Sequence, residues 1–128
     1  MNGKRYFLDT NAIIQLLSGN QALIELLTGA EYIGTSIICE LEFFSFPNLS
    51  DADRLLFHEL RARIHMVDLS SADERLKNRI YSLRSSKRLK LPDAVIAASA
   101  AVEDCALITA DRTMLEIPGL EVESFPLQ

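Results

Sequence analysis

The sequence predicts an α/β fold in which helices cover both faces of a central parallel sheet of about five short strands. Short apolar runs of strand length alternate along the chain with segments whose apolar residues recur at helical spacing. This alternation is typical of parallel sheets, because the crossover between two parallel strands usually contains a helix. The 128 residues, 48% of them hydrophobic, correspond in length to one domain at 1–128 with a sizeable core.

Five apolar runs are the candidate strands. The first, RYFL, is followed by an abrupt change to polar residues at Asp9, Thr10 and Asn11, so we expect the strand to end there. Each later run is bounded by a helical segment or a tight connection. In chain order, the expected strands lie at residues 5–8, 31–36, 64–69, 105–109 and 120–125.

The segments between these runs have helical patterns and helix-ending signals. Gly19 and Gly29 close the first two helices, and either Ser50 or Asp51 opens a later one. Serines are expected to cap the helix at 70–86, and Pro92 suits the first turn of the last helix. The expected helices lie at residues 11–19, 21–29, 49–64, 70–86 and 91–104, with a further helix carrying Glu40 and Glu42.

Composition excludes several classes of protein. No apolar run approaches the roughly 18 residues that span a bilayer, and the first residues do not resemble a signal peptide, so we expect a cytoplasmic protein without membrane contact. Cys39 and Cys105 lie in apolar surroundings and are expected to be reduced core thiols. With only two histidines, His58 and His65, a metal site built from His and Cys is not expected.

The basic residues are unevenly placed in a chain of net charge −5. Seven of the thirteen lie between Arg75 and Lys90, with no acidic residue among them. Such a run is either a solvated helix face or a surface for phosphate backbones or an acidic protein segment. Its members are Arg75, Lys77, Arg79, Arg84, Lys87, Arg88 and Lys90.

Polar side chains follow several of the predicted strands. In open α/β sheets, ligands bind at the carboxyl ends of the strands. We therefore expect acids that are far apart in the sequence to converge there, although each also has a local interpretation as a helix cap, a turn residue or a surface residue. The residues concerned are Asp9, Thr10, Asn11, Thr35, Ser36, Glu40, Glu42, Asp93, Thr109 and Asp111.

A cluster of carboxylates needs a compensating cation. Two like charges about 4 Å apart repel by roughly 4 kcal/mol at an effective dielectric constant near 20. Oxygen ligands without His or Cys favour a hard ion such as Mg²⁺ or Mn²⁺. Such an ion can activate water and stabilise charge on a phosphoryl group during phosphodiester hydrolysis.

Four stretches together resemble the PIN-domain family, and more closely the VapC-type ribonuclease toxins of bacterial toxin–antitoxin pairs. They are FLDTNAII, TSIICELEFFSFP, LKLPDAVIAASA and LITADRTMLEIPGLEV, and the similarity runs from Phe7 to about Val122. The resemblance implies a three-layer α/β/α fold. It also implies a hydrolase that uses three or four carboxylates to hold Mg²⁺ or Mn²⁺ for endonucleolytic RNA cleavage.

Carried over to this sequence, the resemblance makes Asp9 the first acid, Asp93 the third, and Asp111 a fourth ligand that binds metal directly or through water. The second acid is Glu42 or Glu40, and the family pattern of a glutamate followed by two large apolar residues and a small one favours Glu42. The residues expected to support the catalytic metal ligands are Thr10, Asn11, Ser36 and Thr109. The chain departs from the family at Met114 and Leu115, where members often have Asp-Phe, and we expect an effect on local packing.

The resemblance also assigns partners. Arg84, Lys87, Arg88 and Lys90 precede the LPDA turn and are candidate contacts for RNA phosphates. A cognate antitoxin protein would hold the enzyme inactive, and a homodimer is expected.

Two other classes of function remain open. A catalytically inactive PIN-like module would keep the acids and the basic run but bind RNA or a partner without cutting. A receiver-like domain would take a phosphoryl group on Asp68, but it requires paired acids after the first strand, and here Thr10 and Asn11 follow Asp9.

Overall fold

Strands and helices alternate along residues 3–127, the part of the chain that the computed structural model describes. The strands are β1 (Arg5–Leu8), β2 (Tyr32–Ser36), β3 (His65–Val67), β4 (Ala106–Ile108) and β5 (Val122–Glu123). The helices are α1 (Thr10–Leu17), α2 (Gln21–Leu27), α3 (Ile37–Phe44), α4 (Asp51–Arg61), α5 (Glu74–Lys87), α6 (Leu91–Val102) and the 3₁₀ helix η1 (Arg112–Glu116). The predicted α/β fold with five short strands is confirmed.

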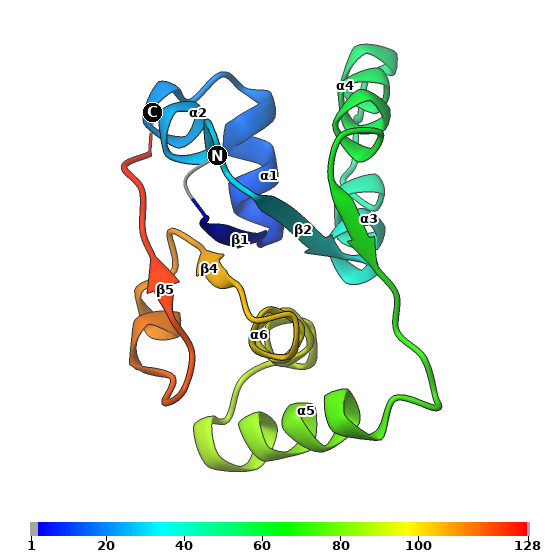
Figure 1. Cartoon of the computed structure of the whole chain (residues 1–128). Helices are drawn as coiled ribbons and strands as arrows, with labels where there is room; N and C mark the ends of the chain where they lie inside the picture. Colours follow the sequence, from blue (N-terminus) through cyan, green and yellow to red (C-terminus); the bar gives the residue numbers. More distant parts are fainter. Residues whose placement is uncertain (1–2, 128) are drawn as a thin grey trace.

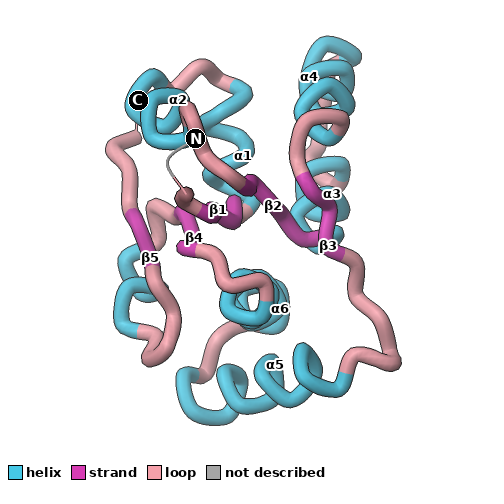
Figure 2. Tube along the Cα trace, viewed as in Figure 1, coloured by secondary structure: helices cyan, strands magenta, loops and turns pink. Residues whose placement is uncertain are grey.

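The five strands form one parallel sheet in the order β3-β2-β1-β4-β5. Helices α1 and α2 lie on one side of the sheet and α5 and α6 on the other, which gives the three-layer arrangement in Figures 1 and 2. Strand β1 is central, and the chain returns to the sheet beside it on both sides, at β2 and later at β4. The carboxyl ends of β1 and β4 therefore form a topological switch point, where α/β sheets open a crevice.

Helix starts follow local capping chemistry, and one predicted cap is wrong. Ser50 caps α4 through a capping box with Asp53, in agreement with the sequence. Helix α5, however, begins at Glu74 with Asp73 as its N-cap rather than a serine. Ser70 instead accepts a hydrogen bond from a backbone N–H within the preceding turn, so the helix starts later than predicted.

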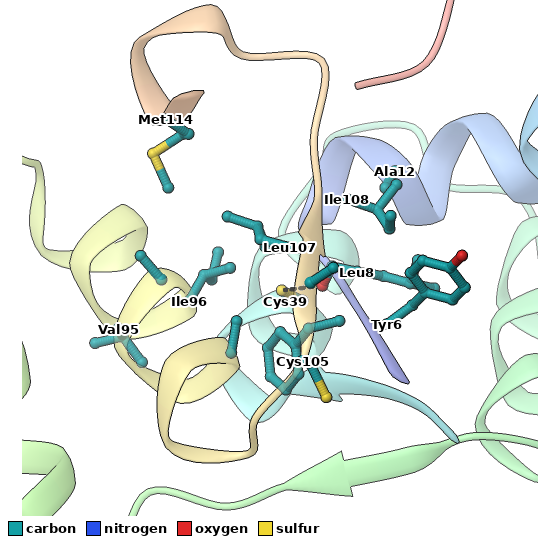
Figure 3. Close-up of a cluster of buried hydrophobic side chains, with 14 of the residues drawn as sticks. Tyr6, Leu8, Ala12, Cys39, Val95, Ile96, Cys105, Leu107, Ile108 and Met114 are labelled. Carbon is teal, nitrogen blue, oxygen red and sulfur yellow. Dashed lines mark hydrogen bonds between the residues drawn. The ribbon is translucent and has the colours of Figure 1, made fainter. Parts of the chain in front are cut away.

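The core lies between the sheet and α6. Every residue of α6 from Ala94 to Ala100 is buried, because small side chains let this helix pack closely against β2, β4 and α3 on one side and α5 on the other. Figure 3 shows Ile96 of this helix beside Leu107 of β4. Cys39 and Cys105 are buried and free, as predicted.

No helix within residues 3–127 has both the length and the apolar character needed to cross a membrane.

Candidate functional site at the carboxyl edge of the sheet

Asp9 lies where β1 gives way to α1, and it has one of the roles that the sequence left open, that of the N-cap of α1. Its Oδ1 accepts a hydrogen bond from the Ala12 N–H at 2.7 Å, which caps α1. Its own N–H donates to the Ile108 carbonyl of β4 at 3.3 Å. The cap and the link to β4 fix the carboxylate at the switch point of the sheet.

The end of β1 is held by side chains from the neighbouring strand and helix. The Leu8 carbonyl accepts a hydrogen bond from the Thr35 hydroxyl at 2.8 Å. It also accepts a weaker one from the Cys39 thiol at 3.7 Å, which Figure 3 shows. All three residues are fully buried, so these donors satisfy a backbone group that water does not reach. Thr35 thereby helps to position the residue that follows, Asp9.

Thr109 connects two of the predicted acids. Its buried hydroxyl accepts a hydrogen bond from the Asp111 N–H at 3.0 Å. Its side chain also hydrogen-bonds the Asp9 carboxylate, which favours the ionised form of that group. Thr109 was expected to support the metal ligands, and the structure places its side chain against the carboxylate of Asp9.

Asp111 has the local role that its position allows and also faces the cluster. Its Oδ1 accepts hydrogen bonds from the backbone N–H and the hydroxyl of Thr113, at 3.0 and 2.8 Å, and so caps η1. The same side chain is exposed and acts electrostatically on Asp9 and Asp93. Just beyond it, Met114 is buried in the core while Leu115 is 47% exposed.

The two glutamates of α3 point in different directions, as expected for residues about 200° apart on a helix. Glu42 accepts a hydrogen bond from the Thr10 hydroxyl at 2.6 Å and acts electrostatically on Asp93. Glu40 instead forms a salt bridge with Arg61 at 2.6 Å. The structure therefore brings Glu42 to the acid cluster and pairs Glu40 elsewhere, while the catalytic role of Glu42 stays a prediction.

Asp93 completes the cluster from the first turn of α6. Burial raises its pKa, the carboxylates of Asp111 and Glu42 raise it further, and Lys90 opposes the rise. Burial likewise raises the pKa of Asp9, with smaller contributions from Asp93 and Asp111. Each shift has the sign expected when an unneutralised carboxylate is buried near others.

The carboxylate oxygens of this cluster are the type of ligand that a hard divalent cation prefers. Four carboxylates approach one another from four segments of the chain, and within residues 3–127 none of them forms a salt bridge with a basic side chain. The arrangement is open, however, since no three acidic, His or Cys side chains of the described residues stand close enough to hold one ion. Side-chain rotations would have to bring the carboxylates together around a metal.

Two further predicted residues lie outside this network of carboxylates. Asn11 is exposed in the first turn of α1. Ser36 is buried, and its hydroxyl oxygen accepts a hydrogen bond from the Ile38 N–H at 3.1 Å. Ser36 thus caps α3, the helix that carries both glutamates, and supports the site only through that helix.

The basic residues near the acid cluster have different environments in the structure. Arg84 donates to the Leu89 carbonyl at 3.3 Å, and Arg88 ends α5 in a left-handed conformation with φ 55°. Lys90 is the N-cap residue of α6.

Lys87 lines a cavity of about 430 Å³ together with Arg112 of η1. Sequence reasoning missed Arg112, although it directly follows the predicted acid Asp111.

Comparisons with known proteins agree on one family. The PIN-domain model matches residues 6–120 of this chain. No curated protein matches it.

Solved structures with the same fold come from toxin–antitoxin complexes. VapBC2 from Rickettsia felis, bound to a promoter DNA fragment, is 21% identical with a TM-score of 0.76, over 95% of this chain and 99% of that one. A toxin–antitoxin complex from Klebsiella pneumoniae is 26% identical with a TM-score of 0.75, over 90% and 94% of the two chains. VapBC-1 from nontypeable Haemophilus influenzae is 20% identical with a TM-score of 0.76, over 94% and 97%.

Proposed function

Since the chain belongs to the PIN-domain family, we propose that it is a metal-dependent endoribonuclease that hydrolyses RNA phosphodiester bonds and serves as the toxin of a toxin–antitoxin pair. The observation that carries this proposal is the approach of four carboxylates, from four distant segments, to one edge of the sheet without a basic side chain paired to them. Uncompensated carboxylates at such a site call for a cation. The carboxylates are those of Asp9, Glu42, Asp93 and Asp111.

These four residues would hold Mg²⁺ or Mn²⁺. When bound, such an ion lowers the pKa of a coordinated water and stabilises charge on the phosphoryl oxygens. The chain's own contribution is orientation: Thr10 holds Glu42, and Thr109 links Asp9 to the segment carrying Asp111. The fixed end of β1 keeps Asp9 in place during the reaction.

RNA binding would require cations beside this acidic edge, because its carboxylates repel phosphates. Lys87 and Arg112 share a cavity next to the 3₁₀ helix that Asp111 caps, and they are the best placed for this role. Arg84, Arg88 and Lys90 are exposed and would be further candidates for phosphate contacts.

This chain also has a surface that would suit a protein partner. A mostly apolar groove of about 180 Å³ lies among α1, α3 and α4, lined by side chains that include Leu17, Phe46 and Leu56. Phe46 is 43% exposed and Leu56 is 40% exposed. Exposed apolar side chains of this kind mark protein contacts, and in a cytoplasmic toxin they would serve the antitoxin or a homodimer.

The test is RNA cleavage by the purified protein with Mg²⁺, compared with the variants Asp9→Asn and Asp93→Asn. Asparagine is also a good N-cap, so Asp9→Asn keeps the hydrogen bond to Ala12 and should fold normally. We expect cleavage to fall at least about 100-fold in both variants, because each removes a ligand of the ion. Cleavage at the parental rate by both variants, with circular dichroism showing intact folds, would refute the assignment.

A second candidate is a PIN-like module that binds RNA or a partner without cutting. The open arrangement of the carboxylates favours it, since no ready metal-binding group exists among the described residues. RNA binding that persists in EDTA, together with no cleavage under Mg²⁺ or Mn²⁺, would support this alternative over the nuclease.

A further inference from the structure

A second polar cleft lies at the opposite edge of the sheet, where the strands begin. It has a volume of about 500 Å³ and is enclosed by α5, the end of α6 and the turn before β5. Val102 ends α6 shortly before β4, and Gly119 precedes β5, so the cleft lies at the amino ends of these two strands. It is therefore remote from Asp9 and its neighbours, which follow the carboxyl ends.

One face of α5 supplies the polar lining. Arg75, Asn78, Arg79 and Ser82 are spaced i, i+3, i+4 and i+7, which places them side by side on the helix. The remaining lining comes from Ala101, Val102 and Gly119 and contains no carboxylate. Within residues 3–127, neither arginine forms a salt bridge, and the nearby Glu74 pairs with Lys77.

Arg79 is held in a position that leaves one donor unused. Its Nη2 donates to the Pro118 carbonyl at 3.2 Å. Its Nε is buried and has no hydrogen-bond partner. A buried N–H without an acceptor is unfavourable, so Arg79 keeps a hydrogen-bonding capacity that no residue of the described chain fills. Arginine binds oxyanions through paired N–H donors, and within residues 3–127 only Nη2 of Arg79 forms a hydrogen bond, which leaves Nη1 as a further donor.

Gly119 is suited to this arrangement in two ways. Its φ of +75° is a conformation that glycine adopts readily, and a Cβ added there would lie 3.1 Å from Arg79 Nη2. The glycine thus allows the turn to bring the Pro118 carbonyl to Arg79 without displacing the guanidinium group.

We propose that this cleft binds a phosphate group, from either an RNA backbone or a free phosphate compound such as a mononucleotide. Two guanidinium groups, an amide and a hydroxyl line the cleft from four positions of one helix, which suits the several oxygens of a phosphate better than the two of a carboxylate. The cleft also has the volume of a typical small-ligand site, so a nucleoside attached to the phosphate fits beside Ala101 and Val102. The proposal is independent of metal binding and of catalysis at the acidic edge.

The test uses the full chain in EDTA and follows backbone amide NMR signals during separate titrations with inorganic phosphate, 5′-AMP and a short single-stranded RNA. We expect chemical-shift changes at the amides of Arg75, Asn78, Arg79 and Gly119. In Arg79→Gln we expect the affinity to fall at least about tenfold below that of the parent. Arg63→Gln removes the same charge from an exposed residue outside the cleft and should bind like the parent. Asp9→Asn should bind inorganic phosphate like the parent, which separates this site from the acidic one.

The three titrations distinguish the sources. If RNA binding weakens in Arg79→Gln together with phosphate binding, the site takes a backbone phosphate; if only phosphate and 5′-AMP bind there, it takes a free phosphate compound. If Arg79→Gln does not fold, Arg75→Gln removes an exposed cleft arginine and must weaken binding instead. Absence of shifts at the cleft amides with all three probes, or parental affinity in a folded arginine variant, would overturn the proposal.

Discussion

The acid cluster and the α5 cleft lie at opposite edges of the sheet and carry opposite kinds of uncompensated charge. At the carboxyl edge, four acids approach one another without a paired cation, and two of them have raised pKa values. At the amino edge, two arginines face a cleft without a carboxylate, and one guanidinium N–H has no acceptor. The net charge of −5 describes neither edge, so what matters for binding is how the fold separates the charges.

The edges also differ in how they are built. The acids come from the ends of β1 and β4 and from α3 and α6, and only the strand order brings them together. The polar lining of the amino-edge cleft comes from a single helix, by helical spacing alone. The first arrangement depends on the whole fold, while the second requires only α5, the end of α6 and the turn at Gly119.

The largest expected effect is a difference in RNA cleavage between variants of the two glutamates of α3. Glu42→Gln should lower Mg²⁺-dependent RNA cleavage at least about 100-fold, because it removes a carboxylate that lies toward Asp93. Glu40→Gln is the matched control. It removes an equal charge two residues away but breaks only a salt bridge to a half-exposed Arg61, which contributes about 0 to 1 kcal/mol.

Initial cleavage rates of both variants on one RNA substrate are the measurement. Glu40→Gln should remain within about threefold of the parent. If Glu40→Gln loses the activity and Glu42→Gln keeps it, the second acid has been assigned to the wrong face of the helix.

The next prediction concerns ligand-dependent stability at the two edges. Mg²⁺ at 100 times its dissociation constant should raise the free energy of unfolding by about 2.7 kcal/mol, and Asp9→Asn should remove this gain. Phosphate should stabilise the protein through the amino edge, with a gain that Arg79→Gln removes and Asp9→Asn leaves intact. Thermal unfolding of each variant with each ligand measures both effects, and a Mg²⁺ gain that survives in Asp9→Asn would place the cation elsewhere.

The sequence predicted the fold because its apolar runs and helical spacings agree with each other. Asp9 and Asp93 were selected because polar residues at strand ends and helix starts can be identified from local pattern alone. The hydrogen bond between Thr10 and Glu42 joins residues 32 apart, and nothing in either local pattern indicates it.

The predicted start of α5 was wrong because several potential caps lie within a few residues. Ser70 accepts a hydrogen bond within the preceding turn, and Asp73 caps the helix. The amino-edge cleft was not predicted either. The sequence shows the run of basic residues at 75–90. Which of them line the cleft and which lie on the open surface depends on where α6 and Gly119 lie against α5.

A smaller effect is expected from the support of the carboxyl edge. Thr35→Val keeps the shape of the side chain but removes the main donor to the buried Leu8 carbonyl, and should cost about 1 to 3 kcal/mol of stability. Thr28→Val is the control, since Thr28 makes the same kind of hydrogen bond to the Ile24 carbonyl at an exposed position, where water replaces the hydroxyl. Urea unfolding measures both, and equal losses would show that burial of the Leu8 carbonyl contributes nothing.

The smallest effect lies at the amino end of β4, where burial and a basic neighbour oppose each other. Burial raises the pKa of the Cys105 thiol from 9.0 to about 11, although Arg5 lowers it. As pH rises above 9.0, the unfolded chain loses this proton while the folded protein keeps it, so stability falls between pH 9.0 and about 11.

Removing the thiol tests this balance. Between about pH 8 and pH 10, the free energy of unfolding should fall by about 1 kcal/mol less in Cys105→Ala than in the parent. The reason is that only the parent has a buried thiol that stays protonated while its unfolded chain loses the proton. Urea unfolding at both pH values gives the difference. An equal loss in the two proteins would mean that Arg5 compensates the thiolate fully, and that cations at this edge stabilise a buried anion as effectively as water does.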